Sequence, residues 1–203
     1  MVSMEATLEG KVAAVRRQAD PDEVRQAVTL LLSIEERHSA SAWPKAFAAR
    51  IDAPGIYTWW VDAEGANALS TGLGLAVQPG LIYGGEAGAT DWSGPLPRRP
   101  SSTLRSRIRD NHLRGGVSAS TFRWTLSAIL RVSLPMKLVG PKKFERSSLH
   151  GLNDWMRTHL DLAVYSFADR DVLDDLETQV LNQLDPSLNI GKVPTSPIRQ
   201  PPQ

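Results

Sequence analysis

Two tyrosines, each placed beside glycine, are the residues of this sequence best suited to act together in chemistry. Tyr57 ends the run Gly55-Ile56-Tyr57, and Tyr83 begins the run Tyr83-Gly84-Gly85. Both surroundings are rich in β-branched and aromatic residues and are bounded by Gly or Pro, which is typical of short strands. Paired as a hairpin, the two strands would bring the phenols side by side. Taken singly, each tyrosine could instead be an ordinary aromatic that packs across the sheet.

Further along the chain, three polar residues stand in positions that could serve a reaction. Arg107 is one of three arginines at alternating positions of a predicted helix, with Arg105 and Arg109, and a solvated helix face explains at least two of them. Glu177 lies at the margin of an apolar stripe, so its carboxylate would be partly buried and would need a partner. A metal or a cation would satisfy it, although a surface position is the alternative. Asn189 could be a simple turn residue.

Charge is distributed unevenly along the chain although the net charge is only +1. Residues 98–146 hold twelve Arg or Lys against two acids, which gives 12 − 2 = +10, whereas residues 150–190 hold two against eight, which gives 2 − 8 = −6. A basic block is expected of a surface that binds nucleic-acid phosphates, because binding releases condensed counterions. The alternative is a solvated surface balanced by the acidic segment. The candidate nucleic-acid-binding residues are Arg105, Arg109, Arg114, Arg123, Lys142 and Lys143.

Composition excludes several other classes of protein. The chain has no cysteine, so it can form neither a disulfide framework nor a thiolate metal site. No apolar run approaches the length of a membrane span, and no secretory signal pattern opens the sequence. We therefore expect a cytoplasmic protein without a membrane partner.

The periodicity predicts an α+β fold with a small antiparallel three-stranded sheet flanked by helices. Asp20-Pro21-Asp22-Glu23 opens a helix expected over 21–38, and Trp43, Phe47 and Ile51 should pack this arm onto the rest. We expect an N-terminal helical arm over 1–50, a domain over 51–191 and a disordered Pro-rich tail over 192–203. Within the domain, the first half is expected to hold a strand over 54–61, a Gly/Ala-rich loop over 62–79, a strand over 80–85 and a loop over 86–100. Two helices should follow, one over 104–114 and one from about 121. The rest is expected to be an irregular connection over 133–146, a helix over 149–160, a strand over 162–167 and a helix over 170–184.

Taken in order, these motifs resemble those of the GIY-YIG nuclease family. The matching pieces are Gly55-Ile56-Tyr57, Tyr83-Gly84-Gly85, Leu104 to His112, Glu177 and Leu188-Asn189. The sequence departs from the family pattern at Gly84, where the family has isoleucine, and in the longer spacing between the tyrosines. Relatives often carry a histidine four residues after the arginine, whereas here that residue is Asn111. His112 comes five residues after Arg107, about 140° round a regular helix, so it reaches the site only if the helix is ending there.

The resemblance implies a metal-dependent endonuclease that hydrolyses phosphodiester bonds in DNA. The tyrosine that acts as general base is left open by the sequence; we prefer Tyr83, with Tyr57 positioning water. The protein would be a monomer or a transient dimer. Two alternatives are a non-catalytic nucleic-acid- or protein-binding module on the same scaffold and an RNA-cleaving enzyme. The residues implied are Tyr57 and Tyr83 on the catalytic face, Arg107 at the scissile phosphate, His112 as a further catalytic candidate, Glu177 as the ligand of Mg²⁺ (or Mn²⁺) and Asn189 as a support of the site.

Overall fold

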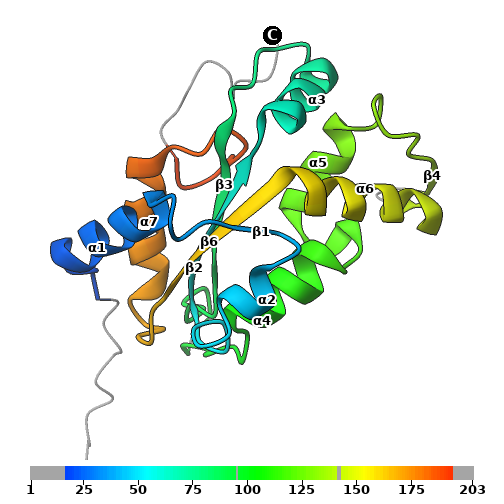
Figure 1. Ribbon diagram of the computed structural model, residues 1–203. Helices are drawn as coiled ribbons and strands as arrows, with labels where there is room; N and C mark the ends of the chain where they lie inside the picture. Colours follow the sequence, from blue (N-terminus) through cyan, green and yellow to red (C-terminus); the bar gives the residue numbers. More distant parts are fainter. Residues whose placement is uncertain (1–16, 95, 141–142, 194–203) are drawn as a thin grey trace, which may run out of the picture.

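An antiparallel sheet of four strands forms the centre of the molecule, in the order β1-β6-β2-β3 (Figure 1). The computed structural model describes residues 17–94, 96–140 and 143–193. The α+β class with an antiparallel sheet between helices is confirmed, but the sheet has one strand more than the three predicted. The strands are β1 (His38–Ser39), β2 (Gly55–Val61), β3 (Gly80–Ala87) and β6 (Leu160–Ser166).

The additional strand replaces the end of the first predicted helix. Helix α1 (Pro21–Leu32) begins at a capping box, in which Asp20 and Glu23 satisfy each other's backbone N–H groups, but it ends six residues before the predicted position. The chain then pairs His38 and Ser39 with β6. Hydrogen bonds along the open edge of β6 thus satisfy backbone groups that a longer helix would have paired internally.

The predicted loop between the first two long strands is wrong, because it contains the helix α3 (Ala63–Leu73). The Asp62 carboxylate caps its start by accepting from the Gly65 N–H at 2.7 Å. Gly74 ends the helix with a φ of 67°, a left-handed conformation that glycine adopts without steric cost. Alanine is the best helix former, so the Gly/Ala content of this segment did not indicate a flexible loop.

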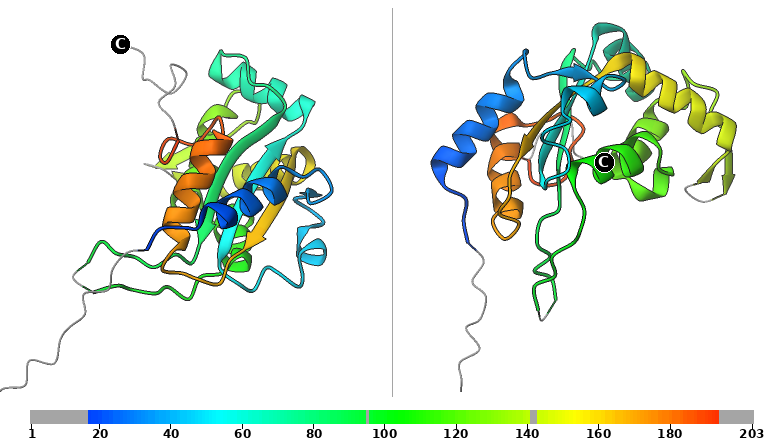
Figure 2. Two further views of the ribbon diagram at one scale, coloured as in Figure 1. Left: turned by 90° about the vertical axis from the view of Figure 1, so that its left-hand side faces the viewer. Right: turned by 60° about the horizontal axis from the view of Figure 1, so that its bottom comes forward.

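Helices cover the two faces of the sheet in different ways. One face carries α1 and α7 (Leu173–Leu184), which lie side by side (Figure 2, left). The opposite face carries α4 (Leu104–Ser106), the π-helix η1 (Arg107–Leu113) and α5 (Thr121–Ile129). The short helix α2 (Trp43–Ala46) joins that second core. As predicted, Trp43, Phe47 and Ile51 are buried there.

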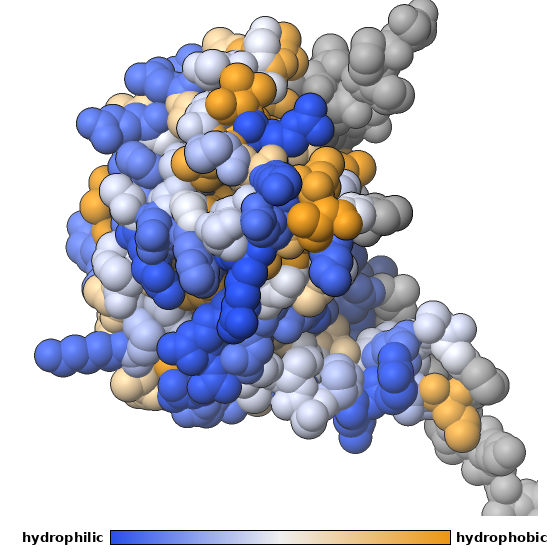
Figure 3. Space-filling model, turned by 90° about the vertical axis from the view of Figure 1, so that its right-hand side faces the viewer, coloured by the Kyte–Doolittle hydropathy of each residue, from blue (hydrophilic) through white to orange (hydrophobic). Residues whose placement is uncertain are grey.

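The remaining elements complete the α5 side of the molecule. The segment predicted to be irregular over 133–146 contains a two-stranded ribbon of β4 (Leu138–Gly140) and β5 (Lys143–Phe144). The 3-10 turn η2 (Val117–Ala119) precedes α5, and α6 (Arg146–His159) precedes β6. This side presents a largely hydrophilic surface with scattered apolar side chains (Figure 3). The last predicted helix starts three residues later than expected, and residues 194–203 of the predicted tail lie outside the described residues.

Candidate active site

The two tyrosines lie on the same face of the sheet. The register pairs Tyr57 with Gly85 and Trp59 with Tyr83, so alternate residues of β2 and β3 present both phenols toward η1 and α5. A Cβ atom at Gly85 would lie only 2.6 Å from the Tyr57 hydroxyl oxygen. Glycine is therefore required there, because it leaves the space across β3 that the Tyr57 ring occupies. The Tyr83 ring stacks on Phe122, with ring centroids 4.5 Å apart.

His112 reaches this face because the helix that carries it is a π-helix. In a π-helix the backbone hydrogen bonds join residues five apart, which places such residues close to the same side. His112 is five residues after Arg107, and its Nε2 atom lies 2.7 Å from the Tyr57 hydroxyl. Its Nδ1 atom lies 2.8 Å from the Ser120 hydroxyl. A regular helix would instead have turned the imidazole away by about 140°.

The hydrogen bonds around His112 are compatible with the tautomer that carries its proton on Nδ1. The Ser120 hydroxyl oxygen caps α5 by accepting from the Arg123 N–H, and it has a second lone pair for an Nδ1–H donor. Nε2 is then the acceptor for the Tyr57 O–H. Burial lowers the pKa of His112 to about 3, and the positive charges of Arg107 and Arg123 act in the same direction. His112 is therefore neutral at physiological pH.

Arg107 is the cation of this face. Burial raises the pKa of Tyr57 well above its usual value, and burial also raises the pKa of Tyr83 to about 12. The negative charge of Glu177 raises the pKa of both phenols further, whereas Arg107 opposes the shift. Arg107 and Glu177 thus both lie within electrostatic reach of the two phenols. The Nε atom of Arg107 is buried and has no hydrogen-bond partner among the described residues. An anionic oxygen would be a suitable acceptor for this N–H group.

Glu177 approaches from the other side of the sheet. It lies on α7, which packs so closely on edge strand β3 that a Cβ atom at Gly84 would be 2.5 Å from the Leu181 Cδ2 atom. The Glu177 side chain is buried, with the residue 7% exposed, and burial raises its pKa. The Lys192 ammonium opposes that shift and donates to both Glu177 and Asp174. Our sequence analysis missed Lys192 because it falls in the Pro-rich segment assigned to the tail.

Asn189 holds the backbone of β3 between the tyrosine and glycine positions. Its side-chain oxygen accepts from the Gly84 N–H at 2.9 Å, and its amide nitrogen donates to the Gly84 carbonyl at 2.9 Å. Both groups of one residue on an edge strand are therefore satisfied by a single side chain. Asn189 is therefore more than a turn residue, because its side chain fixes the strand next to Tyr83.

The predicted nucleic-acid-binding residues divide into exposed and buried groups. Arg105 pairs with Asp52 and Arg109 with Asp110, while Arg114 and Lys143 are exposed. Arg123 is fully buried, and its Nη1 atom donates to the His112 carbonyl at 2.6 Å. This burial removes Arg123 from the candidate phosphate contacts, because α5 turns that position toward η1. Lys142 lies outside the described residues.

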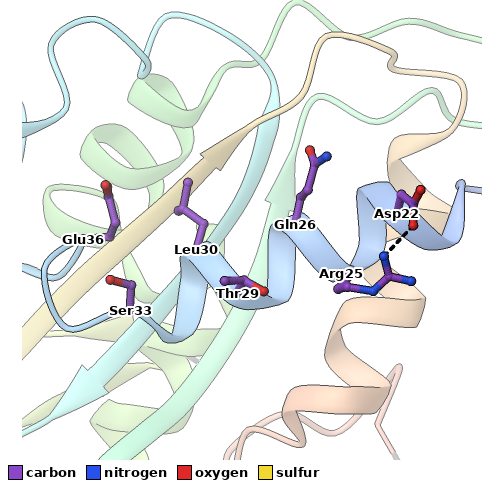
Figure 4. Close-up of a pocket in the computed structure, with 7 residues that line it drawn as sticks. All are labelled: Asp22, Arg25, Gln26, Thr29, Leu30, Ser33 and Glu36. Carbon is purple, nitrogen blue, oxygen red and sulfur yellow. Dashed lines mark hydrogen bonds and ion pairs between the residues drawn. The ribbon is translucent and has the colours of Figure 1, made fainter.

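Another hollow in the structure, along α1, contains no comparable group of residues (Figure 4). Its lining includes the ion pair of Arg25 with Asp22 at 2.5 Å, and it lies on the α1 side of the sheet, away from Tyr57. None of the helices in the described part of the chain has the length and apolar character needed to cross a bilayer.

A family model, the GIY-YIG catalytic domain, matches residues 55–200. The chain belongs to the GIY-YIG family. The match begins at the first residue of β2 and spans both tyrosines, Arg107, His112, Glu177 and Asn189. GIY-YIG proteins are nucleases that generally depend on a divalent metal, so the family implies a nucleic-acid substrate. Comparison with curated proteins and with solved structures found no match.

The residues of this GIY-YIG site are compatible with a metal held by one protein ligand. Within residues 17–94, 96–140 and 143–193, no group of three or more His, Cys, Asp or Glu side chains could hold an ion. Glu177 nevertheless offers a buried carboxylate whose present partner is an ammonium, so this position already accommodates a cation. One carboxylate with several waters suits Mg²⁺, which gives up its hydration shell reluctantly.

Proposed function

We propose that this protein is a metal-dependent endonuclease that hydrolyses phosphodiester bonds in DNA. The observation that carries the proposal is the 2.7 Å hydrogen bond between Tyr57 and neutral His112, beside an arginine with a vacant donor. A phenol joined to a proton acceptor and placed next to a guanidinium suits the activation of water against a phosphate. The basic block over 98–146 supports nucleic acid as the substrate.

Stabilisation of charge is assigned to Arg107 and Glu177. The transition state of phosphodiester hydrolysis concentrates negative charge on the nonbridging oxygens, and Arg107 would donate to one of them. Glu177 would hold the divalent metal, which when bound supplies Lewis-acid stabilisation of the same charge. Lys192 must then release Glu177 or shift toward Asp174, with which it is also paired.

The proton path favours Tyr57 as the general base, which reverses our preference for Tyr83. As a water oxygen forms its bond to phosphorus, the water proton passes to the Tyr57 oxygen. The bond to the leaving oxygen breaks, and this oxygen departs as an alkoxide that takes a proton from solvent. The Tyr57 proton passes at the same time to His112 Nε2. This relay avoids a free phenolate, which the raised pKa of Tyr57 makes unfavourable. Burial, Arg107 and Arg123 also disfavour the imidazolium, so His112 would hold the proton only while the phosphate carries its additional negative charge. The pKa of Tyr83 is also raised, but this residue is only half-buried. Tyr83 would orient the water or the substrate.

Two departures from the family pattern, at Gly84 and at His112, have structural explanations that support an enzyme. Gly84 is the position at which α7 packs closely enough to bring Glu177 to the edge of the sheet. His112, which lies one residue beyond the usual position of the family histidine, contacts Tyr57. Neither irregularity requires that turnover was lost.

A plasmid assay tests the proposal. Supercoiled plasmid incubated with protein and Mg²⁺ or Mn²⁺ should be nicked, and EDTA should abolish nicking. Arg107→Ala and Glu177→Ala should lower the rate by about 10²-fold or more, since each removes stabilisation of the transition state. Arg25→Ala, on the far face of the sheet, is the charge-matched control and should retain the parent rate. Binding without cutting would support the module, and cleavage of RNA alone would support the RNA-cleaving alternative.

A further inference from the structure

We infer that a cleft between α2 and η1 binds the phosphate backbone of the nucleic acid at a distance from the scissile bond. The inference rests on the proposed function and assigns a role to the N-terminal arm, which lies outside the family match over 55–200. The cleft has a volume of about 350 Å³. Its lining residues are Ala40, Ser41, Trp43, Pro44, Arg105, Arg109, Leu113, Arg114 and Arg157.

Four guanidinium groups from three parts of the chain converge on this cleft. Arg105 comes from α4, Arg109 from η1, Arg114 from the residue that ends η1, and Arg157 from the last turn of α6. The arm supplies the opposite wall through α2. Arginine is the side chain best matched to phosphate, because its planar donors bind two oxygens at once.

The carboxylates near these arginines form exposed ion pairs, so they neutralise the charge of the cleft only weakly. Arg105 pairs with Asp52, whose side chain is 67% exposed, and Arg157 lies 3.4 Å from Asp154, whose side chain is 74% exposed. Arg109 pairs with its neighbour Asp110, which is also half-exposed. Exposed ion pairs of this kind contribute little, so a phosphate can share or replace the carboxylate.

A buried guanidinium adds to the positive field around the cleft. Arg157 is close enough to Arg123 to lower its pKa, which burial lowers first, to about 10. Arg123 therefore stays charged at neutral pH, and two of its nitrogens, Nε and Nη2, are buried without partners among the described residues. An anion in the cleft would be attracted by this charge as well as by the exposed arginines.

The position of the cleft relative to Arg107 indicates which part of the substrate it would contact. Arg107 faces the tyrosines, whereas Arg105 and Arg109, two residues to either side, line the cleft on the other flank of the same helix. A helix with its side chains is about 10 Å across. Backbone charges of one strand follow at about 3.4 Å along the axis. A strand crossing η1 would thus place in the cleft a phosphate that is a few nucleotides away from the one at Arg107.

Binding measured without cutting tests the inference. A fluorescein-labelled duplex DNA of 24 base pairs is titrated with the full chain in EDTA over a series of KCl concentrations, with anisotropy as the readout. The double variant Arg114→Ala/Arg157→Ala should lose about two units of slope in log K against log [KCl], and bind roughly five- to tenfold more weakly per arginine at 0.1 M salt. Arg25→Ala should retain the parent slope.

A substitution with the opposite expected sign guards against a folding artefact. Asp52→Asn leaves Arg105 without its carboxylate and should tighten DNA binding by a few fold, which a damaged fold would not do. If the parent protein nicks plasmid but the double variant keeps the parent slope, the cleft is not a phosphate site and the proposed function stands. If the parent neither nicks plasmid nor binds the duplex, the proposed function fails.

Discussion

His112 Nε2 and the Tyr57 hydroxyl lie 2.7 Å apart, in a contact that depends on the π-helical hydrogen bonds of η1. The wider turn brings to Tyr57 a histidine that a regular helix would have turned away. It also leaves the His112 carbonyl for Arg123 Nη1 and directs Nδ1 to Ser120. Three separate contacts therefore fix the orientation of one neutral imidazole, and they connect the chemistry of the site to the packing of α5.

The low pKa of His112 predicts a measurable loss of stability in acid. An unfolded histidine titrates near ~6.5, whereas folded His112 titrates at about 3, so the unfolded state binds one more proton between these values. The free energy of unfolding should fall by about 1.4 kcal/mol per pH unit from this group as the pH drops from roughly 6.5 to 3. Urea unfolding of the parent and of His112→Gln, measured between pH 4.5 and 7, should differ by this slope.

Glu177 acts on stability in the opposite sense, so only the difference between parent and variant is diagnostic. Its folded pKa is raised, so its contribution is present below its unfolded pKa and is lost as the pH rises. This contribution cancels when His112→Gln is compared with the parent. Identical slopes in the two proteins would contradict this prediction, because His112 would then titrate in the folded state as it does in the unfolded state.

Gly85→Ala should lower activity without unfolding the protein. The added methyl group would meet the Tyr57 hydroxyl oxygen at 2.6 Å, and the phenol must then move away from His112. Complete loss of a positioned proton acceptor costs about 10²- to 10⁴-fold. We expect the displaced phenol to lose at least part of this, so nicking should fall by about 10-fold or more. Gly151→Ala in α6 is the control, since its Cβ would contact nothing within 4 Å. It should leave activity unchanged and stabilise the helix by up to about 1 kcal/mol.

Glu177→Gln should separate catalysis from stability. The amide keeps the shape of the side chain but cannot serve as the anionic metal ligand, so nicking should fall by about 10²-fold or more. Because burial disfavours the charged carboxylate, the melting temperature at pH 8 should not fall. Asp174→Asn removes the other acid that pairs with Lys192 and should leave most of the activity. Equal losses in the two variants would count against a specific role for Glu177.

Arg123→Met should also lower activity without loss of stability. Two nitrogens of the buried guanidinium have no partner among the described residues, so an apolar side chain of similar length should leave the free energy of unfolding unchanged or higher. The His112 carbonyl loses its donor, and a less firmly oriented imidazole should lower the nicking rate. Urea unfolding and the plasmid assay on one preparation measure both effects. A loss of stability above about 3 kcal/mol would mean that Arg123 is an essential part of the core.

Local patterns in the sequence were sufficient for much of the fold and for the choice of the candidate site residues. The strands around Tyr57 and Tyr83 and the anchors Trp43 and Phe47 follow from alternation and from apolar spacing. These signals depend on neighbours in the sequence, which is why they can be recognised without a structure.

The remaining features depend on tertiary contacts that leave little trace in the sequence. A change from an α-helix to a π-helix alters no composition, so the direction of His112 could not be predicted. The two-residue strand β1 is too short for any period, and it forms because β6 offers an open edge. Arg123 has a side chain usually assigned to the surface, and Lys192 lies in a segment with the composition of a tail.

The arrival of Glu177 around the edge of β3 has a consequence for the newly made chain. The phenols and Arg107 are synthesised well before α7, and Asn189 follows later still. A ribosome-bound or truncated product that ends ahead of α7 would carry the arginine and both tyrosines but no acid to hold the metal. Under the proposed mechanism, cleaving power would thus appear only after α7 has been synthesised and has docked on the sheet.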